Sequence, residues 1–172
     1  MAQSTSTHLT FAVVAALAVG VTAGDESASK AQGEIPKGKQ TTLGLYVTAK
    51  EAYAMWKAEP TKVKVLDVRT PEEYLFVGHP VGAQHVAWND GPDWEINPHF
   101  VGHVKKVASM NRPIVLICRS GQRSVDAGLA LEQAGFREVY NVLEGFEGPL
   151  DDEHHRGTVG GWRKEGLPWE QL

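Results

Sequence analysis

The sequence predicts an α/β protein with a mainly parallel central sheet flanked by helices. Segments with strand and helix patterns alternate along the chain after the first forty residues, which is typical of this class. The run 113–117 (PIVLI) is apolar throughout, as expected of a strand covered on both faces. Two capping boxes, Thr48 with Glu51 and Thr70 with Glu73, indicate helix starts.

The elements follow in a regular order. The capping box at Thr48 begins a helix that Pro60 ends, and residues 63–66 form a strand. The second capping box begins another helix, with Pro71 at its first position. The remaining elements are expected to be a short strand over 84–88, a polar loop over 89–98, a helix from 97–98 through Met110, the central strand 113–117, a helix over 124–134 ended by Gly135, and a strand over 138–142.

Composition limits the function classes. The chain of 172 residues has room for one domain, and 42% hydrophobic with 22% charged residues is typical of a globular protein. A net charge of −4 argues against a nucleic-acid partner. The stretch 151–155 (DDEHH) lacks the spacing of a closed metal site, so we expect a solvated loop there, no metal ligands and no cofactor.

The first residues resemble an export signal. Residues 9–23 are mostly apolar but too few to span a membrane, and Val21, Thr22 and Ala23 supply the small residues of a cleavage site. We therefore expect a signal peptide over 1–23, cleavage near Ala23, a periplasmic or secreted protein and no stable membrane insertion. An uncleaved anchor or a disordered start is the alternative, since no Lys or Arg precedes the apolar run. Residues 24–40 are expected to be a flexible lead-in.

Cys118 is the single cysteine of the chain and the strongest candidate for chemistry. It lies between the central strand and a helix start, where backbone N–H groups converge and stabilise anions, including a thiolate. Arg119 and Arg123 add positive charge. The pattern indicates a nucleophile or sulfur-carrier site, and a buried, inert thiol is the alternative. A thiol–disulfide oxidoreductase is disfavoured, because no second cysteine can resolve a mixed disulfide.

Three segments resemble the rhodanese family of single-domain sulfurtransferases. They are 66–74 (LDVRTPEEY), 78–83 (GHPVGA) and the loop 118–124 (CRSGQRS), and they stand in the family's order. The resemblance implies a rhodanese-like domain over 41–148. Residues 149–172 depart from the family pattern and are expected to be an insertion and a C-terminal tail, which either reshape the rim of the pocket or bind a partner.

The resemblance implies sulfur transfer from thiosulfate or a similar donor to a thiol, cyanide or protein acceptor, through a persulfide on Cys118. The alternative is a slow or non-catalytic sulfur carrier in a periplasmic sulfur-oxidising assembly, a hypothesis motivated by Trp162 and Trp169 in the tail. Cysteine phosphatases and arsenate reductases are disfavoured, because they place five residues between cysteine and arginine. Here four residues separate Cys118 from Arg123.

Residues of the loop are expected to bind substrate or to shape the anion site. Arg119 is expected to hold the donor, and Ser120 either donates to the persulfide or is solvated. Gly121 allows a turn with positive φ. Arg123 is expected to bond loop carbonyls or a carboxylate, Asp67 being one candidate, and Ser124 to cap the helix. Gln122 completes the loop.

Asp67 and Arg69 are the expected supporting residues at the end of the neighbouring strand. Asp67 either supports the loop or bonds within its own turn, and Arg69 either adds to the positive field or pairs with Glu72 or Glu73. His79 is expected to make a structural hydrogen bond, and no special role is expected for His85. Trp88 and Trp94 either line the pocket entrance or pack in the core or the loop.

Overall fold

The structure is a computed structural model, and it describes residues 34–172. The predicted signal peptide and residues 24–33 of the predicted lead-in lie outside this range. Within residues 34–172, no helix has both the length and the apolar character needed to cross a membrane.

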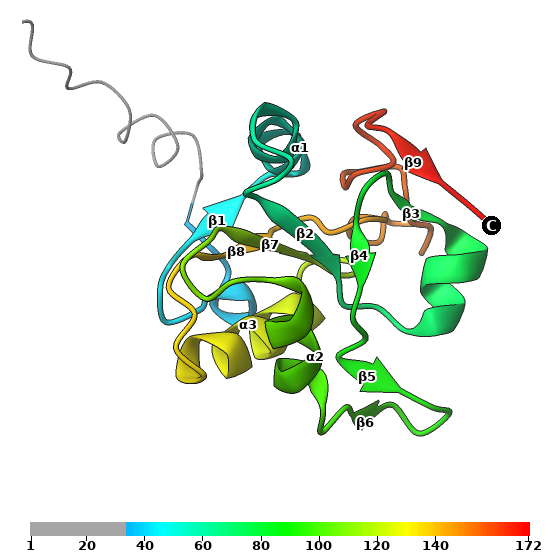
Figure 1. Cartoon of the computed structure of the whole chain (residues 1–172). Helices are drawn as coiled ribbons and strands as arrows, with labels where there is room; N and C mark the ends of the chain where they lie inside the picture. The colour runs from blue at the N-terminus through cyan, green and yellow to red at the C-terminus, as the bar shows by residue number, and fades with distance from the viewer. Residues whose placement is uncertain (1–33) are drawn as a thin grey trace, which may run out of the picture. The chain divides into compact units, whose positions relative to one another are not determined.

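A five-stranded parallel sheet forms the centre of the fold (Figure 1), with the strand order β1-β8-β7-β2-β4. The strands are β1 Tyr46–Val47, β2 Lys64–Asp67, β4 Gln84–His85, β7 Ile114–Ile117 and β8 Val139–Val142. All four residues of β7 are buried, which confirms the central position that its apolar sequence predicts. β2 and β7 end in register, with Asp67 opposite Ile117, so residues that follow these strands share one edge of the sheet.

Helices cover both faces of the sheet, α1 on one and α2 with α3 on the other (Figure 1). Their bounds are α1 Ala49–Ala58, α2 Phe100–Val107 and α3 Arg123–Gln133. Thr48 and Glu51 make both bonds of the predicted capping box at the start of α1. Phe100 and Val104 of α2 and Leu131 of α3 belong to one core cluster. Ala49 and Ala52 of α1 belong to a second core cluster.

Several short elements differ from the sequence prediction. The predicted loop 89–98 contains an antiparallel hairpin, β5 Asn89–Asp90 with β6 Glu95–Ile96. The second capping box forms both of its hydrogen bonds, but the chain then continues as a π-helical turn, η2 Glu73–Val77. Residues Lys37–Lys39, in the predicted flexible lead-in, form a 3₁₀ turn, η1.

The C-terminal residues are part of the fold. β9 Trp169–Glu170 pairs antiparallel with β3 His79–Pro80 (Figure 1). Trp162 is only 1% exposed and belongs to the core cluster on the α1 side, where its indole N–H donates to the carbonyl of Pro168 at 2.8 Å. The segment 149–172 therefore closes one side of the core.

Candidate active site

Cys118 follows β7 directly, and its side chain is 1% exposed. The backbone N–H of Gly121 donates to its Sγ at 3.2 Å, and the hydroxyl oxygen of Ser124 lies 3.3 Å from the same sulfur. Both donors stabilise negative charge on sulfur. The geometry therefore suits a thiolate or the terminal charge of a persulfide.

Gly121 adopts a φ of +85°, as the sequence predicts. A Cβ atom at this position would lie 2.1 Å from the carbonyl oxygen of Leu143, so any side chain would collide with the backbone after β8. The loop therefore needs glycine for two reasons, its left-handed conformation and the close approach of a neighbouring chain segment.

Ser124 does not cap the helix, contrary to the prediction. α3 begins one residue earlier, at Arg123, and Gln122 occupies the cap position without a side-chain cap bond. Ser124 is buried instead, with its oxygen 2.6 Å from Oδ1 of Asn141. Because a hydroxyl has one proton, Ser124 donates either to Asn141 or to the Cys118 sulfur, and a thiolate favours the second arrangement.

Asn141 is a site residue that sequence reasoning missed. It lies on β8 and is 1% exposed, and its side-chain amide donates to the carbonyl of Gly121 at 3.1 Å. Asn141 thus holds the backbone of the loop at Gly121 and also positions the hydroxyl of Ser124. The available signal was a single amide in an otherwise apolar or aromatic strand, VYNV, because a buried amide needs hydrogen-bond partners.

Arg123 pairs with a carboxylate, but the partner is Glu73 and not Asp67. Its two terminal nitrogens donate to the two Glu73 oxygens at 2.7 and 2.6 Å, and its guanidinium lies 4.8 Å from the centre of the Trp94 ring. Burial alone would raise the pKa of Glu73, but the hydrogen bonds and charge of Arg123 outweigh it and lower that pKa. Arg123 therefore ties α3 to η2.

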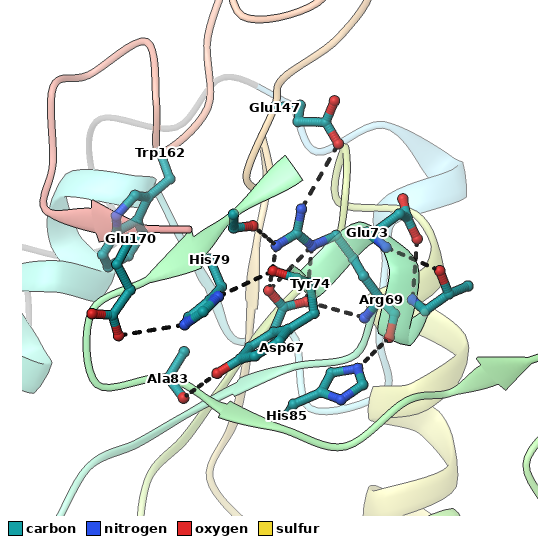
Figure 2. A network of polar contacts seen from close by, with 12 residues as sticks. Asp67, Arg69, Glu73, Tyr74, His79, Ala83, His85, Glu147, Trp162 and Glu170 are labelled. Atoms are coloured by element: carbon teal, nitrogen blue, oxygen red, sulfur yellow. Dashed lines mark hydrogen bonds and ion pairs between the residues drawn. The ribbon is translucent and has the colours of Figure 1, made fainter. Parts of the chain in front are cut away.

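Asp67 and Arg69 form a buried ion pair with each other (Figure 2). The guanidinium of Arg69 donates to both Asp67 oxygens, at distances down to 2.6 Å, and to the carbonyl of Gly78 at 2.6 Å. Burial acts to lower the pKa of Arg69, but the hydrogen bonds and charge of Asp67 outweigh it and raise that pKa. Asp67 thus holds Arg69, and Arg69 pairs with neither Glu72 nor Glu73.

Three buried polar atoms near this edge have no hydrogen-bond partner within residues 34–172. Nη1 of Arg69 lies 3.8 Å from Oε1 of Glu147, too far for a hydrogen bond (Figure 2), and both atoms are without a partner. The third atom is Nε of Arg119, next to the nucleophile. The backbone N–H of Glu147 donates to the carbonyl of Arg119 at 2.9 Å, so these groups belong to adjoining segments.

The rings of His79 and His85 both stack against the ring of Tyr74 (Figure 2). His79 donates through Nδ1 to the carbonyl of Tyr74 at 3.1 Å, which confirms the structural bond predicted for it, and its Nε2 lies 3.4 Å from Glu170 on β9. His85 donates through Nε2 to the carbonyl of Arg69 at 2.8 Å, a contact that the sequence did not indicate.

The remaining candidate residues make contacts that do not involve the Cys118 sulfur directly. Trp88 packs edge-on against Phe100, whereas Trp94 is 47% exposed on the hairpin. Asp151 accepts hydrogen bonds from the backbone of His155, the hydroxyl of Thr158 and the backbone of Glu153, and these bonds lower its pKa. Across the described range, no three His, Cys, Asp or Glu side chains are arranged to hold a metal ion.

Comparison with known proteins assigns the class. Residues 48–150 match the family model of the rhodanese-like domain, which covers more than half of the chain. The chain therefore belongs to the rhodanese-like domain family, as the resemblance of its three segments predicts.

Particular relatives agree with this assignment. The chain is 35% identical over 107 residues to thiosulfate sulfurtransferase 16 of Arabidopsis thaliana, covering 61% of this chain and 78% of the relative. An uncharacterized protein of Rickettsia conorii is 31% identical over 111 residues, with 62% and 81% coverage. The crystal structure of Rv0390 from M. tuberculosis matches with a TM-score of 0.65 and 37% identity, over 74% of this chain and 97% of that one.

Proposed function

We propose that the protein is a sulfurtransferase that moves a sulfane sulfur from thiosulfate or a similar donor to a thiophilic acceptor through a persulfide on Cys118. The observation that carries the proposal is the setting of the only cysteine. Its sulfur lies at the end of the central strand, within reach of the Gly121 N–H and the Ser124 hydroxyl. The likeness to a plant thiosulfate sulfurtransferase supports the same reaction.

The reaction proceeds in two displacements. The Cys118 thiolate attacks the outer sulfur of thiosulfate, a new S–S bond forms, and sulfite leaves with the electron pair of the broken S–S bond. The charge is now on the terminal persulfide sulfur. Cyanide or a thiolate then attacks that sulfur, giving thiocyanate or a new persulfide, and the Cys118 thiolate returns.

The loop residues divide this work. The donors to sulfur, Gly121 and Ser124, stabilise the negative charge before and after transfer. Arg119 binds the anionic donor, a role that suits its buried and unpartnered Nε atom. Arg123 keeps the loop attached to η2 through Glu73 and acts by positioning.

The alternative function is a slow or non-catalytic sulfur carrier in a periplasmic sulfur-oxidising assembly. The two tail tryptophans motivate this alternative. Trp162 is 1% exposed, whereas Trp169 is 38% exposed and packs against Phe146 with ring centroids 6.2 Å apart. Trp162 therefore serves the fold, whereas Trp169 keeps part of its ring exposed. Turnover with thiosulfate and cyanide separates the two functions, because a carrier gives a persulfide but little thiocyanate.

We also propose that the protein is exported. The apolar stretch 9–23 and the small residues before Gly24 support a cleaved signal and a periplasmic or secreted location. Mass spectrometry of the protein from its own cell reports the mature N-terminus, and retention of residues 1–23 would contradict export by cleavage.

The mechanism predicts that Cys118→Ser abolishes sulfur transfer and leaves folding intact, because the hydroxyl does not form a persulfide. After incubation with thiosulfate, the peptide that contains Cys118 in the native protein gains one sulfur, about 32 Da. Cyanide treatment removes this mass and serves as the control. Residual activity in Cys118→Ser would show that the nucleophile is wrongly assigned.

A further inference from the structure

A pocket of about 220 Å³ adjoins the Cys118 loop. Its lining residues are Lys39, Ser120, Gln122, Pro149, Leu150 and Arg156. Ser120 and Gln122 belong to the loop itself. The two cations, Lys39 and Arg156, both lie outside residues 48–150, which match the family model. The charge of this pocket is therefore supplied by residues on either side of the part that matches the family model.

Lys39 is tied to the same residues that shape the active loop. It is half-buried at the end of η1, and its amino group donates to the carbonyl of Leu143, which approaches Gly121 closely. Its own carbonyl lies 3.5 Å from the side-chain amide of Asn141, which also bonds the carbonyl of Gly121. These contacts fix the position of Lys39 relative to the sulfur.

The charge of Lys39 interacts with the nucleophile. Burial lowers the pKa of Lys39, whereas the negative charges of Glu144 and the Cys118 thiolate act in the opposite direction. The Glu144 carboxylate also accepts the backbone N–H of Ala49 at 3.3 Å, at the start of α1.

Arg156 approaches the pocket from the C-terminal segment. Its Nη1 donates to the carbonyl of Gly148 at 2.6 Å, which uses one of the five N–H donors of the guanidinium. The backbone on either side is held as well. The N–H of His155 donates to Asp151, and the N–H of Gly157 donates to the carbonyl of Glu147 at 2.7 Å. The guanidinium is thus placed with donors to spare for an anion.

We propose that Lys39 and Arg156 form a cationic rim that binds the charged head group of the sulfur donor and favours dianionic over monoanionic donors. This inference rests on the proposed function and adds donor selection by two positions outside the family match. Thiosulfate and methanethiosulfonate offer a matched comparison. Both yield their outer sulfur to the thiolate by the same displacement, with sulfite or methanesulfinate leaving, but they carry two charges and one.

Kinetics with the two donors test the rim. In Lys39→Met or Arg156→Met, we expect kcat/KM to fall roughly tenfold for thiosulfate and roughly threefold for methanethiosulfonate, because the dianion interacts more strongly with a cation. Lys39→Arg should keep the native donor preference. Lys37→Met is the matched control, because Lys37 lies exposed in the same η1 turn, and it should behave as the native protein. Equal losses with both donors, or no loss, would overturn the proposal.

A binding measurement separates this inference from the proposed function. Sulfite, a dianion at mildly alkaline pH, is titrated calorimetrically into Cys118→Ser and into Cys118→Ser with Lys39→Met. Roughly tenfold weaker binding in the double variant supports the rim, even where the native protein shows no turnover. Identical affinities, or no sulfite binding to Cys118→Ser, would refute the rim even where the native protein is an active sulfurtransferase.

Discussion

The Cys118 sulfur depends on a hydroxyl that has two acceptors. Ser124 lies between Sγ of Cys118 and Oδ1 of Asn141, at 3.3 and 2.6 Å. Because the hydroxyl has one proton, we expect it to donate to Asn141 when the sulfur is a neutral thiol and to turn to the sulfur when the sulfur is charged. The charged sulfur is thereby stabilised without movement of the backbone, which is the preorganisation that favours a nucleophile.

Gly121 is the residue at which the loop tolerates least change. Gly121→Ala places a Cβ 2.1 Å from the Leu143 carbonyl oxygen at positive φ, so we expect a loss of about 3 kcal/mol or more in the free energy of unfolding. Urea denaturation measures the loss.

Gly91→Ala is the matched control for Gly121→Ala. Gly91 has a φ of +71°, but a Cβ there would meet no atom within 4 Å. Gly91→Ala should reduce the free energy of unfolding by only about 1 kcal/mol, the cost of placing an alanine at positive φ. Similar losses at the two positions would show that the close approach to Leu143 is unimportant.

The identities of the loop residues were predictable from the sequence, whereas their partners were not. The positive φ of Gly121 followed from the turn that the loop needs, but the pairing of Arg123 depends on η2 lying beside α3. Glu73 is fifty positions earlier in the chain. Its neighbours in sequence indicate a capping box but do not indicate that its carboxylate also pairs with a distant arginine. It makes both contacts, because its N–H bonds the Thr70 hydroxyl while its carboxylate also bonds Arg123.

At the scale of elements, Glu73 and Trp94 attach two separate segments to the start of α3. η2 reaches Arg123 through the paired carboxylate, and the turn of the β5–β6 hairpin reaches it through the Trp94 ring. A guanidinium bonds a carboxylate in its plane and an aromatic ring on its face, so one side chain serves both contacts. The orientation of the helix that follows the nucleophile therefore depends on Arg123.

The lowered pKa of Glu73 predicts a pH dependence of stability. A carboxylate with a lowered folded-state pKa stabilises the protein above its unfolded value, here 4.5, and this contribution is lost as the pH falls through the folded pKa. Glu73→Gln should therefore cost about 1.5–3 kcal/mol at pH 7 and reduce the further loss on acidification below pH 4.5.

Urea denaturation across the acid range measures both effects. Glu72→Gln is the matched control, because Glu72 is exposed and adjacent in sequence, and it should change stability little. An unaltered acid dependence in Glu73→Gln would mean that other carboxylates account for it.

At the scale of the whole molecule, the core on the α1 side depends on residues far along the chain. Trp162 belongs to that cluster, and Trp169 packs above Gly78, where a Cβ would lie 2.6 Å from the indole ring. The sequence indicated the order of the main strands and helices, because periodicity and caps are local. It did not indicate the return of the C-terminal segment, because two-residue strands such as β3 and β9 leave no periodic pattern.

Trp162→Ala should reduce the free energy of unfolding by about 3–5 kcal/mol, because a large buried ring and its hydrogen bond to Pro168 are lost. Trp169→Ala is the comparison. Its side chain is 38% exposed, so we expect a loss of about 1–2 kcal/mol. Denaturant titration followed by circular dichroism measures both. Equal losses would contradict the assignment of Trp162 to the core.

The burial of Trp162 also sets the order in which the domain is completed during synthesis. β7 and the Cys118 loop leave the ribosome well before Trp162 does, yet the layer beneath α1 has a gap until that indole arrives. The core cluster on the α1 side is therefore complete only after the C-terminal segment has emerged, whereas Cys118 belongs to the cluster on the other face of the sheet.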